Sequence, residues 1–148
     1  MNVAFFIIPK HEVAFVYDYF TMRQALEKME FHRYSAIPIL TKVGEYVGTL
    51  NEGDLLWKLK HTSGLDFSKT EDIPLKEVPL QRDVKPISIR TDIEKIYNLA
   101  IDQNFIPIID DSEIFIGIIR RRELIEYMYK KLIDKSNEDK KNYCEVNL

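Results

Sequence analysis

Three consecutive arginines, Arg120, Arg121 and Arg122, form the clearest candidate binding group in this sequence. They immediately precede an apolar helical pattern, so we expect them at the start of a helix. Basic residues are otherwise unfavourable there, because the helix dipole is positive at that end. Guanidinium groups donate forked hydrogen bonds that match phosphate oxygens. The run therefore indicates a local anion site, and the alternative is a solvated face in which the arginines pair with Glu123 and Glu126.

The other reactive side chains form no catalytic or metal-binding pattern. No serine or cysteine stands in a recognisable nucleophile motif with a spaced histidine, and the sequence has no Gly-rich phosphate loop. The three histidines and the single cysteine share no metal-ligand spacing. We therefore expect no catalytic residues, no metal site and no enzymatic activity.

The composition is that of an ordinary folded protein. The 148 residues are 45% hydrophobic and 30% charged, with five glycines and six prolines. A net charge of -3 offers no general attraction to nucleic acid or to an anionic membrane. The longest apolar runs fall far short of the ~20 residues that a membrane span needs, and no signal sequence opens the chain. With Cys144 as its only cysteine, the chain is predicted to be cytoplasmic, with no nucleic-acid partner and no membrane insertion.

The sequence contains one unit twice. Three landmark residues return 69 positions later: Pro38 as Pro107, Gly48 as Gly117 and Asp54 as Glu123. Either copy alone, at roughly half the chain, would bury too little apolar surface to be comfortably stable. An open solenoid needs about three or more repeats. We therefore predict a pseudo-symmetric pair that buries its apolar faces against itself, with the functional surface at the seam between the copies.

Each copy reads as β-α-β-β-α. In the first copy the pattern predicts a strand over residues 11–20, a helix with an apolar face from Met22 to Met29, a hairpin that turns at Gly44, and a helix over residues 55–59. In the second copy it predicts strands over 84–89, 105–109 and 114–119, with helices over 93–100 and 123–133.

The predicted organisation has four parts. Residues 1–62 form motif 1, residues 63–72 form a linker, residues 73–134 form motif 2, and residues 135–148 form a polar C-terminal tail. The tail has no periodic apolar face, so we expect it to be frayed or only partly helical.

At this level of detail the sequence resembles a tandem pair of CBS (cystathionine-β-synthase) domains. Four ordered fragments carry the resemblance: Ala25-Leu26-Met29, Ser35-Ala36-Ile37-Pro38, Val47-Gly48 and Asp54-Leu55-Leu56. The resemblance implies an α/β (α+β) fold, in which two β-α-β-β-α motifs pack through their sheets as one Bateman module. It also implies seam clefts that often bind adenine nucleotides, and modules that pair into homodimers.

The arginine run makes the sequence similar to stand-alone bacterial CBS-pair proteins that bind cyclic di-AMP. In those proteins a tyrosine, a hydroxyl residue and an alanine before Ile-Pro hold adenine, and arginines of the second motif meet the phosphates. The residues that this resemblance implies for ligand binding are Ala14, Tyr34, Ser35, Ala36, Pro38, Asn51, Asp54, Arg120, Arg121 and Arg122.

The chain also departs from the family pattern. Asn51 replaces the hydroxyl residue of the nucleotide signature, and Asp54 keeps its ribose-binding aspartate. In the second copy Arg120 and Glu123 stand at these two positions, and Glu12 replaces a lysine that lines the pocket in the family. These differences predict one principal site, with adenine and ribose on the first copy and phosphate met by arginines of the second.

The function implied is that of a regulatory module that senses an adenine nucleotide and signals to a partner protein. Cyclic di-AMP is the preferred ligand, AMP, ADP and ATP are the alternatives, and no cofactor is expected. A ligand-independent module for dimerisation or docking is an alternative of a different class, and an undetected enzyme is a third.

Overall fold

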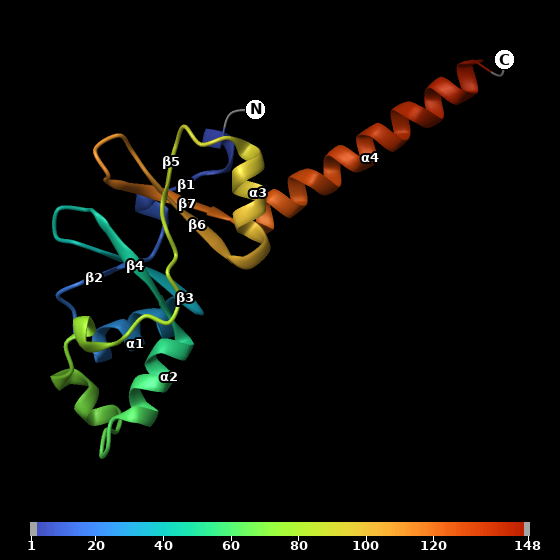
Figure 1. The fold of residues 1–148 in the computed structure, drawn as a ribbon. Coiled ribbons are helices and arrows are strands. Elements are labelled where there is room, and N and C mark those ends of the chain that lie inside the picture. Colours follow the sequence, from blue (N-terminus) through green and yellow to red (C-terminus); the bar gives the residue numbers. More distant parts are fainter. Residues whose placement is uncertain (1–2, 147–148) are drawn as a thin grey trace.

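The structure is a computed structural model that describes residues 3–146, and it contains two sheets and four α-helices within that range (Figure 1). The elements of the first half, in chain order, are η1 (Val3–Phe6), β1 (Ile8–Pro9), η2 (Lys10–Glu12), β2 (Val16–Tyr17), α1 (Met22–His32), β3 (Ala36–Leu40), β4 (Tyr46–Asn51) and α2 (Glu52–His61). The second half contains η3 (Phe67–Asp72), η4 (Leu75–Glu77), β5 (Ile87–Ser88), α3 (Ile93–Asp102), β6 (Phe105–Ile109), β7 (Phe115–Arg120) and α4 (Arg121–Val146).

The order β-α-β-β-α appears in both copies, which confirms the predicted fold class. One sheet has the strand order β2-β3-β4 and the other β1-β7-β6-β5. In each copy the first strand pairs in parallel with the second, and the last two strands form an antiparallel hairpin. Gly44 turns the first hairpin with φ of 95°, a backbone region that glycine adopts without steric cost.

Local chemistry explains the limits of α1. The Thr21 hydroxyl accepts a hydrogen bond from the Gln24 amide, and the Gln24 side chain accepts one from the Thr21 amide. This reciprocal pair satisfies two amides at the start of the helix. The helix ends at Arg33, whose φ of 58° is left-handed. Between these ends the predicted face is confirmed, because Met22, Ala25 and Met29 are buried.

The leading segment of each copy is buried in the core of the other copy. Strand β1 joins the second sheet through antiparallel pairing with β7, and Val3 and Phe6 lie in the second hydrophobic core. In return, Leu75 and Val78, which lead into the second copy, lie in the first core. The chain therefore exchanges its two leading segments, and neither copy has a complete core of its own.

A third cluster joins the two sheets. Val13, Leu40, Phe115 and Ile118 are buried together, so strands of both sheets contribute to this seam. The hairpin tips are also linked, since the Phe115 amide donates to the Gly44 carbonyl at 2.9 Å. The predicted packing of the motifs through their sheets is thus confirmed.

Two of the strand predictions are wrong over most of their length. Of residues 11–20 only Val16–Tyr17 form a strand, because the chain makes a 3-10 turn at Lys10–Glu12 and then crosses between the sheets. Of residues 84–89 only Ile87–Ser88 pair. Pro86 lacks a backbone N–H for a ladder, and the preceding residues run irregularly along the seam.

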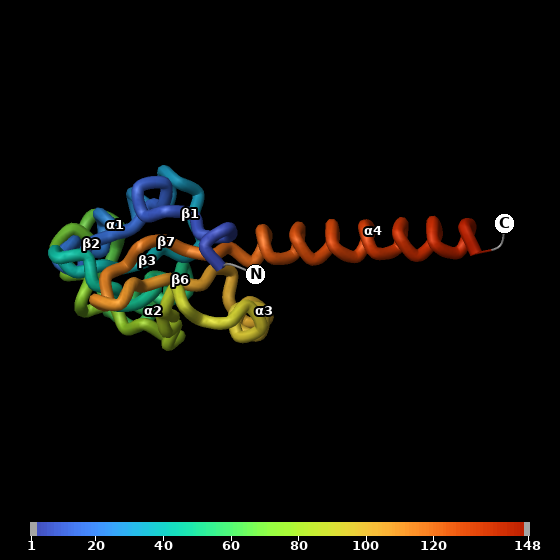
Figure 2. Tube along the Cα trace, turned by 90° about the horizontal axis from the view of Figure 1, so that it is seen from above, coloured from blue at the N-terminus to red at the C-terminus, as the bar shows by residue number. Residues whose placement is uncertain are grey.

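The prediction of a frayed tail is also wrong, because α4 continues without a break from Arg121 to Val146 (Figure 2). Its first turns are held to the body by Leu124, which is 1% exposed. Once a helix is nucleated, each further residue adds a hydrogen bond at little cost. Lysine and glutamate, which are frequent in the tail, lose little rotamer freedom in a helix.

The predicted linker is also more ordered than a plain connector. Residues 67–72 form η3, which packs against α1, and Thr70 within it is 1% exposed. Among residues 3–146, no helix has the length and apolar character needed to cross a bilayer.

The close approach of β1 to β7 predicts an asymmetric effect of two glycine substitutions. A Cβ on Gly117 would lie 2.2 Å from the Ile8 carbonyl oxygen, so one of the two strands must move. Its counterpart Gly48 would bring a Cβ to 2.7 Å from the tip of Leu80, a flexible side chain. We expect Gly117→Ala to lower the free energy of unfolding in urea by about 2–3 kcal/mol and Gly48→Ala by less than about 1 kcal/mol. Equal losses would contradict this account of the exchanged strand.

Candidate ligand-binding cleft

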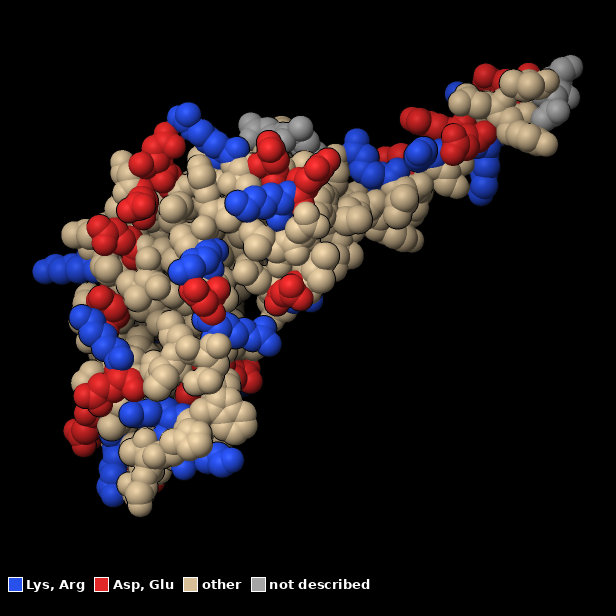
Figure 3. Space-filling model, in the orientation of Figure 1, with Lys and Arg blue, Asp and Glu red and all other residues tan. Residues whose placement is uncertain are grey.

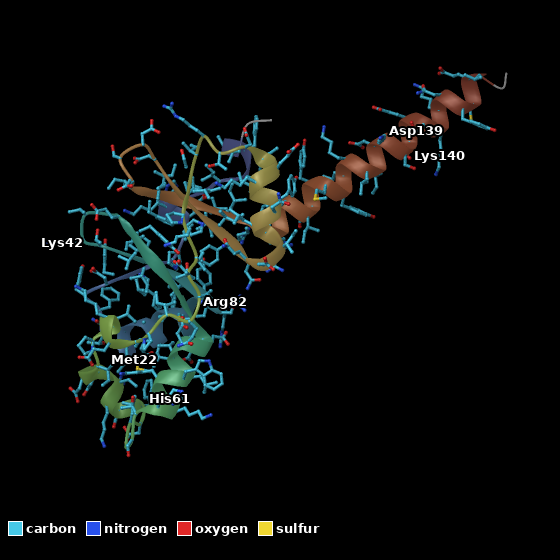
Figure 4. All side chains as sticks on the ribbon, in the orientation of Figure 1. Met22, Lys42, His61, Arg82, Asp139 and Lys140 are labelled. Atoms are coloured by element: carbon cyan, nitrogen blue, oxygen red, sulfur yellow. The ribbon has the colours of Figure 1, made fainter. Side chains whose placement is uncertain are left out.

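A polar cleft of about 380 Å³ opens where the two copies meet. We call it the seam cleft, and its lining residues are Ala36, Thr49, Asn51, Arg82, Asp83, Val84, Asp102, Gln103, Asn104 and Phe105. The first copy supplies the start of β3 and the end of β4, while the second supplies the segment before β5 and the start of β6. In Figure 4, Arg82 lies at the junction of the halves, and Figure 3 shows the surface hollowed there in the same orientation.

Two amide atoms in the wall of the seam cleft have no hydrogen-bond partner. The Asn51 Nδ2 donor and the Gln103 Oε1 acceptor are both buried atoms without a partner in the structure. A buried polar group without a partner costs about 1–3 kcal/mol. One donor and one acceptor in the wall of the cleft are thus left unsatisfied by the protein itself.

The charged residues of the cleft include one unpaired cation. Arg82 is exposed and, within the described part of the chain, takes part in no ion pair. Its neighbour Asp83 is paired with Lys85 at 3.0 Å. Arg82 can therefore meet an anionic ligand group without first losing a carboxylate partner.

A partly buried tyrosine links the two walls of the cleft. The Tyr46 hydroxyl donates to the Val84 carbonyl at 2.7 Å and lies 2.7 Å from the Thr49 hydroxyl. Burial raises the pKa of the Tyr46 phenol, so it remains a neutral donor. Because Thr49 and Val84 come from different copies, this network sets the spacing of the two walls.

The three arginines at the start of α4 point to different partners. Arg121 donates from Nε to the Gln103 carbonyl at 3.1 Å and also bonds the Asn104 side chain, so it holds one wall of the seam cleft. Arg122 pairs with Glu126 at 3.1 Å. Of the three consecutive arginines, Arg121 is thus the one that contacts residues of the cleft wall.

Arg120 forms an ion pair with Glu123. Hydrogen bonds to Glu123 raise the pKa of the Arg120 guanidinium, and Tyr34 adds a smaller electrostatic contribution in the same direction. Tyr34 of the first copy therefore lies in the neighbourhood of Arg120 of the second. Both Arg120 and Arg122 show the carboxylate pairing that the sequence left open as an alternative to anion binding.

The structure separates the other residues predicted for the ligand site. Asn51 and Ala36 line the seam cleft, whereas Tyr34 lines a larger apolar groove between α1, α2 and η3. Ser35 is exposed, and its carbonyl accepts from the Glu52 amide at 3.1 Å. Ala14 and Pro38 are buried. The predicted set is therefore divided between different surfaces and the core.

The Asp54 carboxylate accepts hydrogen bonds from two backbone amides. The residue is 1% exposed, and its two carboxylate oxygens accept from the Asn51 amide at 2.8 Å and the Gln81 amide at 2.9 Å. The carboxylate thus joins the start of α2 to the segment that leads into the second copy. This role does not require a ligand.

The wall supplied by the second copy was not predicted from the sequence. Gln103, Asn104 and Phe105 lie 69 positions after Tyr34, Ser35 and Ala36, so they occupy the matching places in the repeat. Val84 likewise follows Ala14 by 70 positions. The repeat itself was the signal, because a pseudo-symmetric pair must form each seam position twice.

Comparison with known proteins gives the following relatives. The family model for the CBS domain matches residues 7–61 and 75–130. Cyclic di-AMP receptor B of Bacillus subtilis (strain 168) is 25% identical over 131 residues, which are 88% of each protein.

Solved structures show the same fold. The crystal structure of CbpB in complex with c-di-AMP has a TM-score of 0.82 and 23% identity, and the match covers 93% of this chain and 91% of that one. The structure of CBSX2 in complex with AMP has a TM-score of 0.69 and 20% identity, with 87% and 96% covered.

The bonds of Asp54 predict a large structural effect for its removal. Asp54→Ala would leave the Asn51 and Gln81 amides without their acceptor, so we expect the free energy of unfolding to fall by about 2–4 kcal/mol. Glu123→Ala is the matched control from the second copy, and it should cost less than about 1 kcal/mol because the pair with Arg120 is exposed. Urea denaturation without ligand measures both, and an equal, small loss would show that Asp54 is not structural.

Proposed function

Because the chain belongs to the CBS domain family, we propose that it is a regulatory protein that senses an adenine nucleotide at the seam and performs no catalysis. Cyclic di-AMP is the preferred ligand, and AMP, ADP and ATP are the alternatives. The observation that carries the proposal is the buried, unpartnered amide pair of Asn51 and Gln103 in the seam cleft.

The amide pair matches the hydrogen-bonding edge of adenine. Adenine presents an acceptor at N7 next to a donor at its N6 amino group. The Asn51 Nδ2 donor can bind the ring nitrogen, while the Gln103 Oε1 acceptor can bind the amino group. Guanine carries a second acceptor, O6, at the place of the amino group, so this pair favours adenine over guanine.

Cations near the cleft suit the phosphate. Arg82 is exposed and unpaired within the described residues, and Arg121 lies against Gln103 and Asn104. Each charge-assisted contact contributes about 1.5–3 kcal/mol, so two would separate nucleotides from nucleosides. The cleft volume of about 380 Å³ lies near the lower end of the range for ligand pockets and suits one nucleotide unit. A cyclic dinucleotide would extend its second half along the seam.

The second half would reach the surface predicted from the sequence. Tyr34 lies in the neighbourhood of Arg120, and Ser35 follows Tyr34 in the chain. We assign this surface as the pseudo-symmetric counterpart of the seam cleft. Relatives support the ligand class, since one is named as a cyclic di-AMP receptor and two solved relatives hold c-di-AMP or AMP.

Ligand binding would be signalled by a change in the association of this protein with a partner protein. A ligand that contacts both copies changes how they are held, and coupling of about 1–3 kcal/mol is enough to alter binding to a partner protein. Exposed apolar residues on α2, such as Leu56 and Trp57, fit a homodimer, and they equally favour the alternative of a ligand-independent docking module. A sensor of this kind would act in the cytoplasm, where adenine nucleotides are abundant.

Calorimetry against cyclic di-AMP, AMP, ADP and ATP tests the proposal directly. We expect saturable binding of cyclic di-AMP, weaker binding of the mononucleotides and no conversion of any ligand during the titration. Cyclic di-GMP is the matched control, since the amide pair should discriminate against its guanines. Failure of all four adenine ligands to bind at high concentration would leave the docking module as the function.

Substitutions locate the site on the seam. Gln103→Leu removes the acceptor for the adenine amino group, so we expect the affinity for cyclic di-AMP to fall about tenfold. Arg121→Ala combined with Arg122→Ala should lower it about 10- to 100-fold, while Lys130→Ala on the same helix should have less than about a twofold effect. The same titrations measure all three. If Tyr34→Leu abolishes binding and Gln103→Leu does not, the ligand occupies the Tyr34 surface alone.

A further inference from the structure

The far half of α4 projects away from the body of the protein. Figures 1 and 2 show the helix projecting from the second copy in both views. Every residue from Met128 to Val146 is exposed. Propagation from the nucleus at Leu124 accounts for the length of α4, but most helical stability in proteins comes from packing of one face. A surface that covers the projecting part of this 26-residue helix would therefore stabilise it further.

One face of α4 carries a regular apolar stripe. Residues of the stripe are spaced alternately by four and three positions: Ile125, Tyr129, Leu132, Ser136, Asp139, Tyr143 and Val146. Its apolar members are between 57% and 85% exposed. Leu124 and Tyr127, which pack on the second core, lie outside this stripe. This spacing is the core pattern of a two-stranded coiled coil.

We propose that α4 of a second copy covers this stripe, with the two helices running antiparallel. The distal half of each helix would then lie along the proximal half of the other, where Ile125, Tyr129 and Leu132 are already exposed beside the body. The inference rests on the homodimer of the proposed function and adds α4 to its interface, beside the exposed apolar residues of α2.

Charge decides between the two directions of the partner helix. A parallel pair would place Asp139 against the partner's Asp139 in the core, and Lys135 beside the partner's Lys140. Both contacts join like charges, which are unfavourable at these positions. Figure 4 shows Asp139 and Lys140 on the projecting half, and Figure 3 shows charges of both signs along it.

An antiparallel pair centred near residue 134 removes the aspartate contact. Asp139 then faces the hydroxyl of the partner's Tyr129, and Tyr143 packs on the partner's Ile125. On the flank, Glu126 lies beside the partner's Lys140, which gives two symmetric ion pairs. Ile133, which is 41% exposed, meets its own counterpart near the two-fold axis. Only Lys135 faces a like charge in this arrangement.

Disulfide trapping in the full chain tests both the pairing and its direction. In a Cys144→Ser background, the double variant Ile125→Cys with Tyr143→Cys should form a covalent dimer under mild oxidation. The single variants Ile125→Cys and Tyr143→Cys should not, because an antiparallel pair keeps identical residues far apart. Cross-linking of the single Tyr143→Cys variant would instead show a parallel pair and overturn the proposal.

Sedimentation of the unmodified chain separates this inference from the proposed function. A dimer in solution without trapping in the double variant would overturn the pairing of α4 and leave the homodimer in place. A monomer at micromolar concentration would overturn both the pairing of α4 and the homodimer. The variant Leu132→Glu checks the two proposals separately. We expect its dimer dissociation constant to rise at least tenfold, because a charge enters the stripe. We expect the resulting monomer still to bind cyclic di-AMP, because the seam lies within one chain.

Discussion

The reciprocal burial of the two leading segments is the contact on which the rest of the structure depends. Val3 and Phe6 complete the core of the second copy, while Leu75 and Val78 complete the core of the first. Each copy is too small to bury enough apolar surface alone, so the exchange turns two marginal units into one stable fold. The seam between the copies is consequently a rigid feature of the monomer, and it does not depend on assembly of separate domains.

Because the copies are interleaved, a site at the seam is coupled to both of them. The Tyr46 hydroxyl joins Thr49 of the first copy to Val84 before the second, and Asp54 joins the start of α2 to Gln81. A molecule that binds between these walls acts on bonds that hold the copies in register.

The two copies share their packing and differ in their polar chemistry. Asp54 is buried and bonded to backbone amides, while its counterpart Glu123 is exposed enough to pair with Arg120. Asn51 lines the seam cleft with an amide donor that has no partner, whereas Arg120 at the matching position pairs with Glu123. The matching positions of the two copies are therefore related by the repeat and distinct in charge.

The order of helices and strands could be predicted because it depends on local patterns. The apolar face of α1, the turn at Gly44 and the register of the repeat each involve residues that are close in the chain or related by a fixed offset. The lengths of β2, β5 and α4 could not be predicted from the sequence. Strand length depends on partners from distant segments, and helix propagation depends on nucleation at Leu124.

The sequence by itself determined the fold class and the presence of arginines near a seam, because these follow from periodicity, repetition and residue type. Only the tertiary structure decided which residues meet. It brought Asn51 and Gln103 into the lining of one cleft, joined the Asp54 carboxylate to the Gln81 amide, and bound Arg121 to Asn104 in the wall of that cleft. The reason is that a cleft between copies is made from segments whose approach is set by the exchanged cores, and that approach is not encoded in any local pattern.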